Sequence, residues 1–278
     1  MIGFGEEMHK SGSIFLLITI YSLSGCSPLS LASMAGQTIV RTAVTAHEQN
    51  VEKAEQNHAI AIANYNVGVE YLREGDYEKA LERLNKAQEA DPAYVPIYNA
   101  LGLAFQRLEQ PENAEKNFKR ALTLDDSDSD TLNNYGQFLC NSGREAQADE
   151  YFMKAAANPF YKTPEIPYTN AGLCVMKNQQ RDTAAEYFSK ALSLNPEVPA
   201  ALLQMSEISY DKGNFPAARD YLKRFLEVSR HTARSLWLGI RIEIELGDMD
   251  ALSSYALLLR NDFADTEEAE LLRISGIR

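Results

Sequence analysis

Residues 61–94, AIANYNVGVEYLREGDYEKALERLNKAQEADPAY, contain the first copy of a pattern that recurs through most of this 278-residue chain. The pattern is centred on glycines that follow one another at intervals of 34, 34 and 36 residues: Gly68, Gly102, Gly136 and Gly172. Twelve residues after each glycine stands an alanine, and four residues later a large apolar residue; these pairs are Ala80 and Leu84, Ala114 and Phe118, Ala148 and Phe152, and Ala184 and Phe188. A fixed period of this length is typical of a solenoid, in which similar units stack in a row. Solenoids present extended surfaces to partners, so the pattern predicts a binding scaffold without catalytic chemistry.

The small residues of the pattern predict pairs of closely packed helices. Glycine or alanine lets two antiparallel helices approach each other, while larger side chains fill the space between neighbouring pairs. We therefore expect an all-α protein whose stacked pairs form a concave face, built mainly from the first helix of each pair. A leucine in place of Gly136 or Ala148 should overpack this stack.

The template resembles the tetratricopeptide repeat, in which a glycine is followed by a tyrosine, an alanine, a large apolar residue and a closing proline. Residues 61–94 carry nearly all of these, including Tyr71 and Pro92. The resemblance implies a right-handed α-solenoid of about six repeats, each an antiparallel helix pair. The expected repeats are residues 61–94, 95–128, 129–164, 165–198, 199–232 and 233–266. The sixth is degenerate, and residues 267–278 should cap the array toward water.

In this repeat family, fixed positions of each first helix face the concave groove. They predict a partner-binding set made of Tyr65, Val69, Leu72, Leu103, Arg107, Asn133, Gln137, Leu173 and Met176. The apolar members suit the apolar face of a partner helix or an extended peptide. In the first repeat an alternative is that these side chains pack against a preceding helix. The family's clamp for a peptide carboxylate is not convincingly present, because Tyr65 and Val69 occupy two of its positions.

The amino-terminal residues resemble a lipoprotein leader. Residues 14–23, IFLLITIYSL, form an apolar stretch too short to span a bilayer but typical of a signal-peptide core. The sequence LSGC at residues 23–26 resembles a bacterial lipobox. This resemblance implies that residues 1–25 are a lipoprotein signal peptide and that Cys26 is lipidated, which anchors the chain at the periplasmic face of the outer membrane. A plain secretory leader with an incidental cysteine is the alternative.

The segment between the leader and the repeats has two expected parts. Residues 26–42 should form a lipidated tether, and residues 43–60, which are rich in helix formers, should form a lead-in helix. Glu6 and Glu7 are unusual in a leader, and translation from Met8 would remove both.

Composition argues against several other classes of function. The net charge of −12 opposes nucleic-acid binding, which needs clustered Lys and Arg. The sequence has no Gly-rich phosphate loop, nucleophile elbow or spaced metal ligands, so we expect no enzyme activity, cofactor or metal. Cys140 and Cys174 fall in the first helices of adjacent repeats. They could form a disulfide if their Cα atoms lie within about 7 Å, with buried free thiols as the alternative.

The interval between the third and fourth repeats is lengthened by residues 158–164, NPFYKTP. The two prolines predict a rigid, irregular link. Phe160 and Tyr161 could form an exposed contact for a partner or fold back as packing, and the sequence favours neither.

Two stretches extend the resemblance to the type IV pilus biogenesis and stability lipoproteins (the PilF/PilW family). They are LNNYGQFL at residues 132–139 and ARSLWLGIR at residues 233–241. The resemblance implies a pilotin-like monomer that binds the secretin subunit and promotes its outer-membrane localisation and multimerisation. The alternative is a repeat lipoprotein that serves another envelope assembly, such as peptidoglycan synthesis or a different secretion system. A cytosolic co-chaperone adaptor would require that the leader is false.

Overall fold

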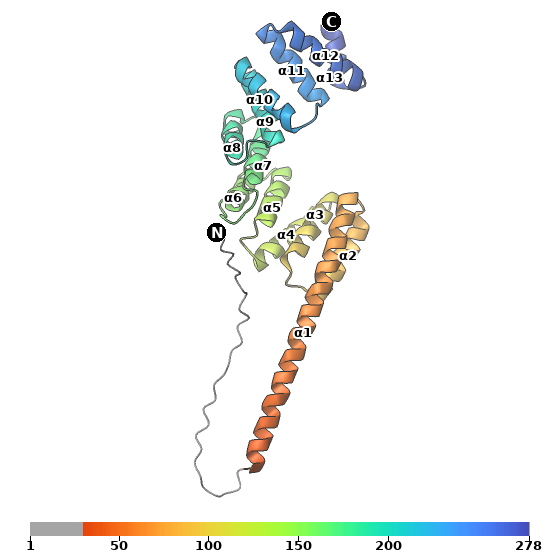
Figure 1. Ribbon diagram of the computed structural model, residues 1–278, viewed down its shortest axis with the longest axis vertical. Helices are drawn as coiled ribbons and strands as arrows, with labels where there is room; N and C mark the ends of the chain where they lie inside the picture. The colour runs from red at the N-terminus through yellow and green to blue at the C-terminus, as the bar shows by residue number, and fades with distance from the viewer. Residues whose placement is uncertain (1–29, 278) are drawn as a thin grey trace, which may run out of the picture. The chain divides into compact units, whose positions relative to one another are not determined.

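The structure, a computed structural model, describes the backbone of residues 30–277 and the side chains of residues 41–277 (Figure 1). The predicted signal peptide and the lipidation site Cys26 lie outside the described residues. Within residues 30–277 the chain forms thirteen α-helices and no strand, which confirms the predicted all-α class. The helices are α1 (Ser30–Glu74), α2 (Tyr77–Ala90), α3 (Val95–Arg107), α4 (Pro111–Leu124), α5 (Ser129–Asn141), α6 (Glu145–Ala156), α7 (Glu165–Met176), α8 (Arg181–Leu194), α9 (Pro199–Asp211), α10 (Phe215–Val228), α11 (Ala233–Leu246), α12 (Met249–Asp262) and α13 (Glu267–Ser275).

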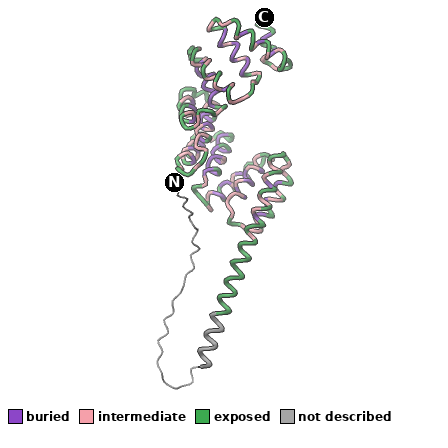
Figure 2. The backbone as a smooth tube through the Cα atoms, viewed as in Figure 1, coloured by how far each residue is buried: buried purple, intermediate pink, exposed green. Residues whose placement is uncertain are grey.

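Helix α1 differs from the expected tether and separate lead-in helix. It begins at Ser30, inside the predicted tether, and continues without a break into the first helix of the first repeat. No glycine or proline stands between Gly36 and Gly68, so nothing in the sequence ends the helix over that span. Residues 41–56 are exposed throughout (Figure 2).

Residues 55–278 form one compact unit, made of the expected six helix pairs. The last part of α1 is followed by α2, and the later pairs are α3 with α4, α5 with α6, α7 with α8, α9 with α10, and α11 with α12. Helix α13 contacts α11 and α12, and buries Ala269 and Leu272 in their cluster. These pairs confirm the predicted solenoid of tetratricopeptide repeats. None of the helices within residues 30–277 is long and apolar enough to cross a membrane.

Each early pair is held at close range by the glycine of its first helix. A Cβ atom on Gly102 would lie 2.6 Å from the ring of Phe118, and one on Gly136 would lie 2.8 Å from the ring of Phe152. Both phenylalanines are buried. In the fifth pair Ser206 replaces the glycine, and its hydroxyl donates a hydrogen bond of 2.7 Å to the carbonyl of Ala218.

The sixth pair is less degenerate than the sequence suggested. Its second helix buries Leu252, Ala256 and Leu259 at the spacing of the buried residues of the earlier pairs. Ile240 stands where those pairs carry glycine, and Ala256 stands where they carry Leu or Phe. The close approach of the two helices is nevertheless kept one residue earlier, where a Cβ atom on Gly239 would lie 2.9 Å from the ring of Tyr255.

We predict that Gly136→Leu lowers the free energy of unfolding by about 1–3 kcal/mol or more, because the new side chain must displace the buried ring of Phe152. The loss is measured from the midpoint of chemical unfolding followed by circular dichroism. Gln137→Leu is the control, since it introduces the same residue at the adjacent, exposed position of α5. Equal midpoints for the two variants would show that the glycine is not needed for packing.

Candidate partner-binding groove

The first helices of the first two repeats enclose a hollow, here called the α1/α3 hollow. Five predicted groove residues line it: Tyr65, Val69, Leu72, Leu103 and Arg107. Its volume is about 310 Å³. The four apolar members are half-buried, so each packs on one side and presents surface on the other. Tyr65, Val69 and Leu72 are spaced four and three residues apart along α1, which places them on one face of the helix.

Aromatic packing and charge define the chemistry of the α1/α3 hollow. The ring of Tyr65 meets that of Tyr94 edge to face, with centroids 5.5 Å apart. Burial raises the pKa of the Tyr65 hydroxyl, and the nearby Tyr94, Asp130 and Asp128 raise it further, so the phenol stays neutral. Among residues 41–277 Arg107 forms no ion pair, and its side chain is exposed. The hollow therefore combines apolar walls with two cations, since Arg73, which pairs with Glu70, also lines it.

Asn133 was predicted to line the groove, but the structure buries it, with only 7% of the residue exposed. Its Oδ1 accepts a hydrogen bond of 2.9 Å from Nδ2 of Asn170 on α7. Nδ2 of Asn134 likewise donates to Oδ1 of Asn99 on α3, at 3.1 Å. These asparagines join the first helices of successive repeats, and each pair satisfies polar atoms that are at least partly buried.

The other predicted groove residues lie apart from the α1/α3 hollow. Gln137 is exposed on α5, and Leu173 is 37% exposed on α7. Met176 is half-buried and packs against the cluster that contains Ala201 and Met205. The structure thus brings five of the nine predicted residues together and leaves these three separate.

A second hollow, between α9 and α11, was not predicted. Glu207 and Tyr210 occupy in the fifth repeat the positions of Val69 and Leu72 in the first. Trp237 corresponds in the same way to Tyr65. The positional rule that identified the early groove residues would have identified these, had it been extended to the last two repeats.

The link between the third and fourth repeats combines both expected alternatives. The hydroxyl of Tyr161 lies 3.1 Å from Oδ1 of Asp130, to which it donates a hydrogen bond, and its ring is half-buried. Phe160 is 90% exposed. Tyr161 therefore belongs to the packing of the link, and Phe160 is available on the surface.

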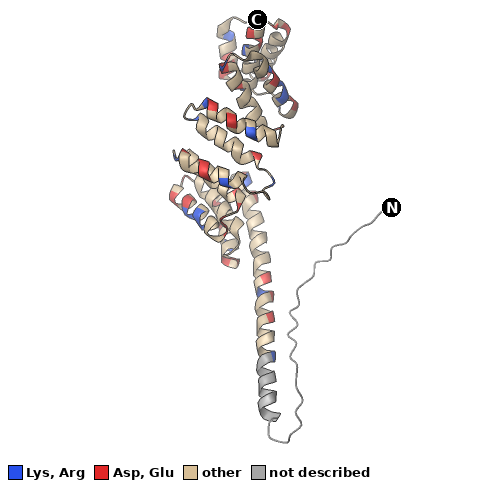
Figure 3. Cartoon of the chain, turned by 90° about the vertical axis from the view of Figure 1, so that its left-hand side faces the viewer, with Lys and Arg blue, Asp and Glu red and all other residues tan. Residues whose placement is uncertain are grey.

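Lys and Arg are interspersed with Asp and Glu over the described helices (Figure 3). Several pairs join adjacent helices of the array. Glu115 accepts hydrogen bonds from Arg144, at 2.9 Å, and from the hydroxyl of Tyr135, at 2.9 Å. The Arg144 guanidinium, the Lys119 ammonium and the Tyr135 hydroxyl together lower the pKa of the Glu115 carboxyl to about 2, against the opposing effect of burial. The carboxylate is thus charged at neutral pH and connects α4 with the α5/α6 pair.

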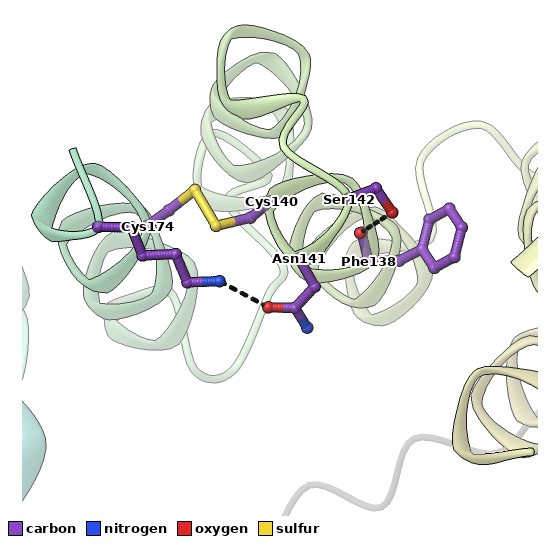
Figure 4. Close-up of a disulfide and its surroundings, with 6 residues drawn as sticks. Phe138, Cys140, Asn141, Ser142 and Cys174 are labelled. Atoms are coloured by element: carbon purple, nitrogen blue, oxygen red, sulfur yellow. Dashed lines mark hydrogen bonds between the residues drawn. A yellow bond between two sulfur atoms is a disulfide. The ribbon is translucent and has the colours of Figure 1, made fainter. Parts of the chain in front are cut away.

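The two cysteines within the described residues form a disulfide between α5 and α7 (Figure 4). The Cα atoms of Cys140 and Cys174 are 5.9 Å apart, inside the range that a disulfide needs. Both side chains are buried. Beside them Nζ of Lys177 donates a hydrogen bond of 2.8 Å to Oδ1 of Asn141. Of the two alternatives that the sequence left open, the structure has the disulfide.

Comparisons with known proteins agree with this architecture. Family models described as TPR repeat and tetratricopeptide repeat match residues 68–109, 95–128 and 175–235. The type IV pilus assembly protein PilF of Pseudomonas aeruginosa is 33% identical over 218 residues, covering 78% of this chain and 86% of that protein. The solved structure of Pseudomonas aeruginosa PilF gives a TM-score of 0.73 at 30% identity, covering 79% of this chain and 99% of the other. The solved structure of PilW, a widely conserved type IV pilus biogenesis factor, gives a TM-score of 0.67 at 29% identity and covers 77% of this chain and 98% of the other.

We predict that replacing both cysteines, Cys140→Ser with Cys174→Ser, lowers the free energy of unfolding by about 2–4 kcal/mol, because the unfolded chain gains freedom. Urea unfolding followed by circular dichroism measures the change. Reductant should lower the native protein to the level of the variant and leave the variant unchanged. A native protein that is insensitive to reductant would contradict the prediction.

Proposed function

Since this chain belongs to the tetratricopeptide-repeat family of type IV pilus assembly proteins that includes PilF and PilW, we propose that it acts as a pilotin-like outer-membrane lipoprotein. In this role it binds the secretin subunit of the pilus machinery and promotes the localisation and multimerisation of that subunit in the outer membrane. The protein acts as a scaffold whose partner is another polypeptide.

The observation that carries this proposal is the apolar α1/α3 hollow within a protein of this family. Tyr65, Val69, Leu72 and Leu103 present half-buried apolar surface in a cavity of about 310 Å³. A hollow of this kind suits one or two apolar side chains of a helix or extended segment. Arg107 at its edge suits an acidic group of the same segment.

Two observations support a periplasmic, lipid-anchored location. The sequence at residues 23–26 resembles a lipobox, which assigns the lipid to Cys26. The disulfide between Cys140 and Cys174 is of the kind that persists in oxidising compartments, among them the bacterial periplasm. Several acyl chains on one residue anchor a protein durably, whereas a single chain binds membranes only marginally.

We expect metabolic labelling with palmitate to mark the native protein and to fail for Cys26→Ala, because that variant lacks the acylated sulfur. The label is read from the purified protein, and Cys140→Ala serves as the control that should keep it. Absence of label from the native protein would refute the lipid anchor and leave the scaffold proposal to the binding experiment.

We expect Val69→Glu and Leu103→Glu each to weaken secretin binding by about tenfold or more, since each puts a carboxylate into an apolar hollow. Binding is measured with purified secretin subunit, and secretin multimers are quantified in membranes of cells that carry each variant. Val67→Glu is the matched control, because Val67 is exposed on the same helix and does not line the hollow.

Cells that lack the protein should lose secretin multimers and pili. Unchanged amounts of secretin multimers and normal piliation would reject the pilotin role and favour a role in another envelope assembly. Normal binding by both groove variants, with multimers lost in the deletion, would instead show that the partner uses another surface.

A further inference from the structure

The second hollow, here called the α9/α11 hollow, differs in chemistry from the first. It has a volume of about 290 Å³ and lies between the first helices of the fifth and sixth repeats. Three arginines line it, Arg181, Arg234 and Arg241, together with the carboxylates of Glu207 and Asp211. The local charge is therefore +1, in a chain whose net charge is −12.

Two of the three guanidinium groups already have carboxylate partners. Arg234 donates two hydrogen bonds to Glu207, of which the one from Nε to Oε1 spans 2.5 Å. Arg181 pairs with Asp211. Each of these two ion pairs is neutral, so neither arginine is free for a further anion without losing its partner.

Arg241 is held differently, by an aromatic ring. Its guanidinium carbon lies 4.1 Å from the centroid of the Tyr210 ring, and no ion pair involving Arg241 is seen among residues 41–277. Stacking on a ring face leaves the edge of the guanidinium, with its N–H groups, able to donate to a carboxylate. Arg241 is thus the cation of the hollow that can accept a new anionic partner.

The remaining walls are aromatic and apolar. Trp237 is half-buried and Leu238 is buried, and both line the hollow together with Tyr210. Trp and Tyr supply large contact areas at small entropic cost, which is why they recur at protein interfaces. An apolar side chain of a ligand can therefore pack beside the group that Arg241 binds.

From this arrangement we propose that the α9/α11 hollow binds a segment of a partner polypeptide in which an acidic side chain adjoins an aromatic one. The carboxylate pairs with Arg241, and the aromatic side chain packs against Trp237. A polyanion is disfavoured, since Glu207 and Asp211 stand in the same wall and repel additional negative charge. The inference is independent of the α1/α3 hollow and of the pilotin role.

The chain provides its own reporter for a test, because Trp237 is its one tryptophan. The full-length protein in detergent is titrated with the peptide acetyl-Gly-Asp-Phe-Gly-amide while tryptophan fluorescence is recorded. The expected result is a saturable change in fluorescence. The Asn counterpart, acetyl-Gly-Asn-Phe-Gly-amide, should bind about tenfold more weakly, because it lacks the negative charge. Equal binding of the two peptides, or no saturable change, overturns the proposal. This comparison uses only the native protein, so it does not depend on whether a variant folds.

Arg241→Gln should weaken binding of the acidic peptide by about tenfold. Arg224→Gln is the matched control: Arg224 also stacks on a tyrosine, 5.5 Å from the Tyr221 ring, and its loss changes the net charge equally. The control should stay within about twofold of the native protein. An equal loss in both variants, or a single-stranded oligonucleotide that binds as tightly as the peptide, would overturn the proposal.

Discussion

The array depends on the close approach of two helices at a position where the first helix has no side chain. Gly102, Gly136 and Gly172 each lie against the ring of a phenylalanine on the second helix of the same pair. Glycine within a helix costs roughly 0.5–1 kcal/mol relative to alanine. Burial of a whole phenyl ring against the bare backbone offsets that cost. The first helices of the pairs line both hollows, and Arg181 at the start of α8 adds to the lining of the second.

Most of the fold follows from the repeat pattern, because the residues that determine helix pairing are local and recur at a fixed interval. The α1/α3 hollow was predictable for the same reason. Asn133 could not be placed in this way, since it is buried and bonded to Asn170, which lies 37 residues along the chain and outside its own repeat. The extent of α1 was also missed, because the pattern marks where a repeat begins but not where a helix without breakers begins. In the sixth pair the glycine that lies against an aromatic ring, Gly239, stands one residue before the position that the 34-residue period predicts, which concealed a preserved packing.

The two hollows give one layer of helices two kinds of surface. Near its beginning the layer presents apolar side chains from Tyr65 to Leu103, and near its end it presents guanidinium groups beside Trp237. In a solenoid each repeat contacts only its neighbours, so the chemistry of one repeat can change without disturbing distant ones. The consensus positions hold the pairs together, whereas the variable positions between them distinguish one end of the layer from the other.

The disulfide between α5 and α7 has a mechanical consequence. A force that pulls the two ends of the array apart passes through every junction between repeats in series, because each repeat contacts only its neighbours. The junction between the third and fourth repeats contains the long link with Pro159 and Pro164. It is also the junction that, among the described residues, has a covalent bond between its first helices. Under tension the array would therefore extend elsewhere first, and the third and fourth repeats would move as one piece.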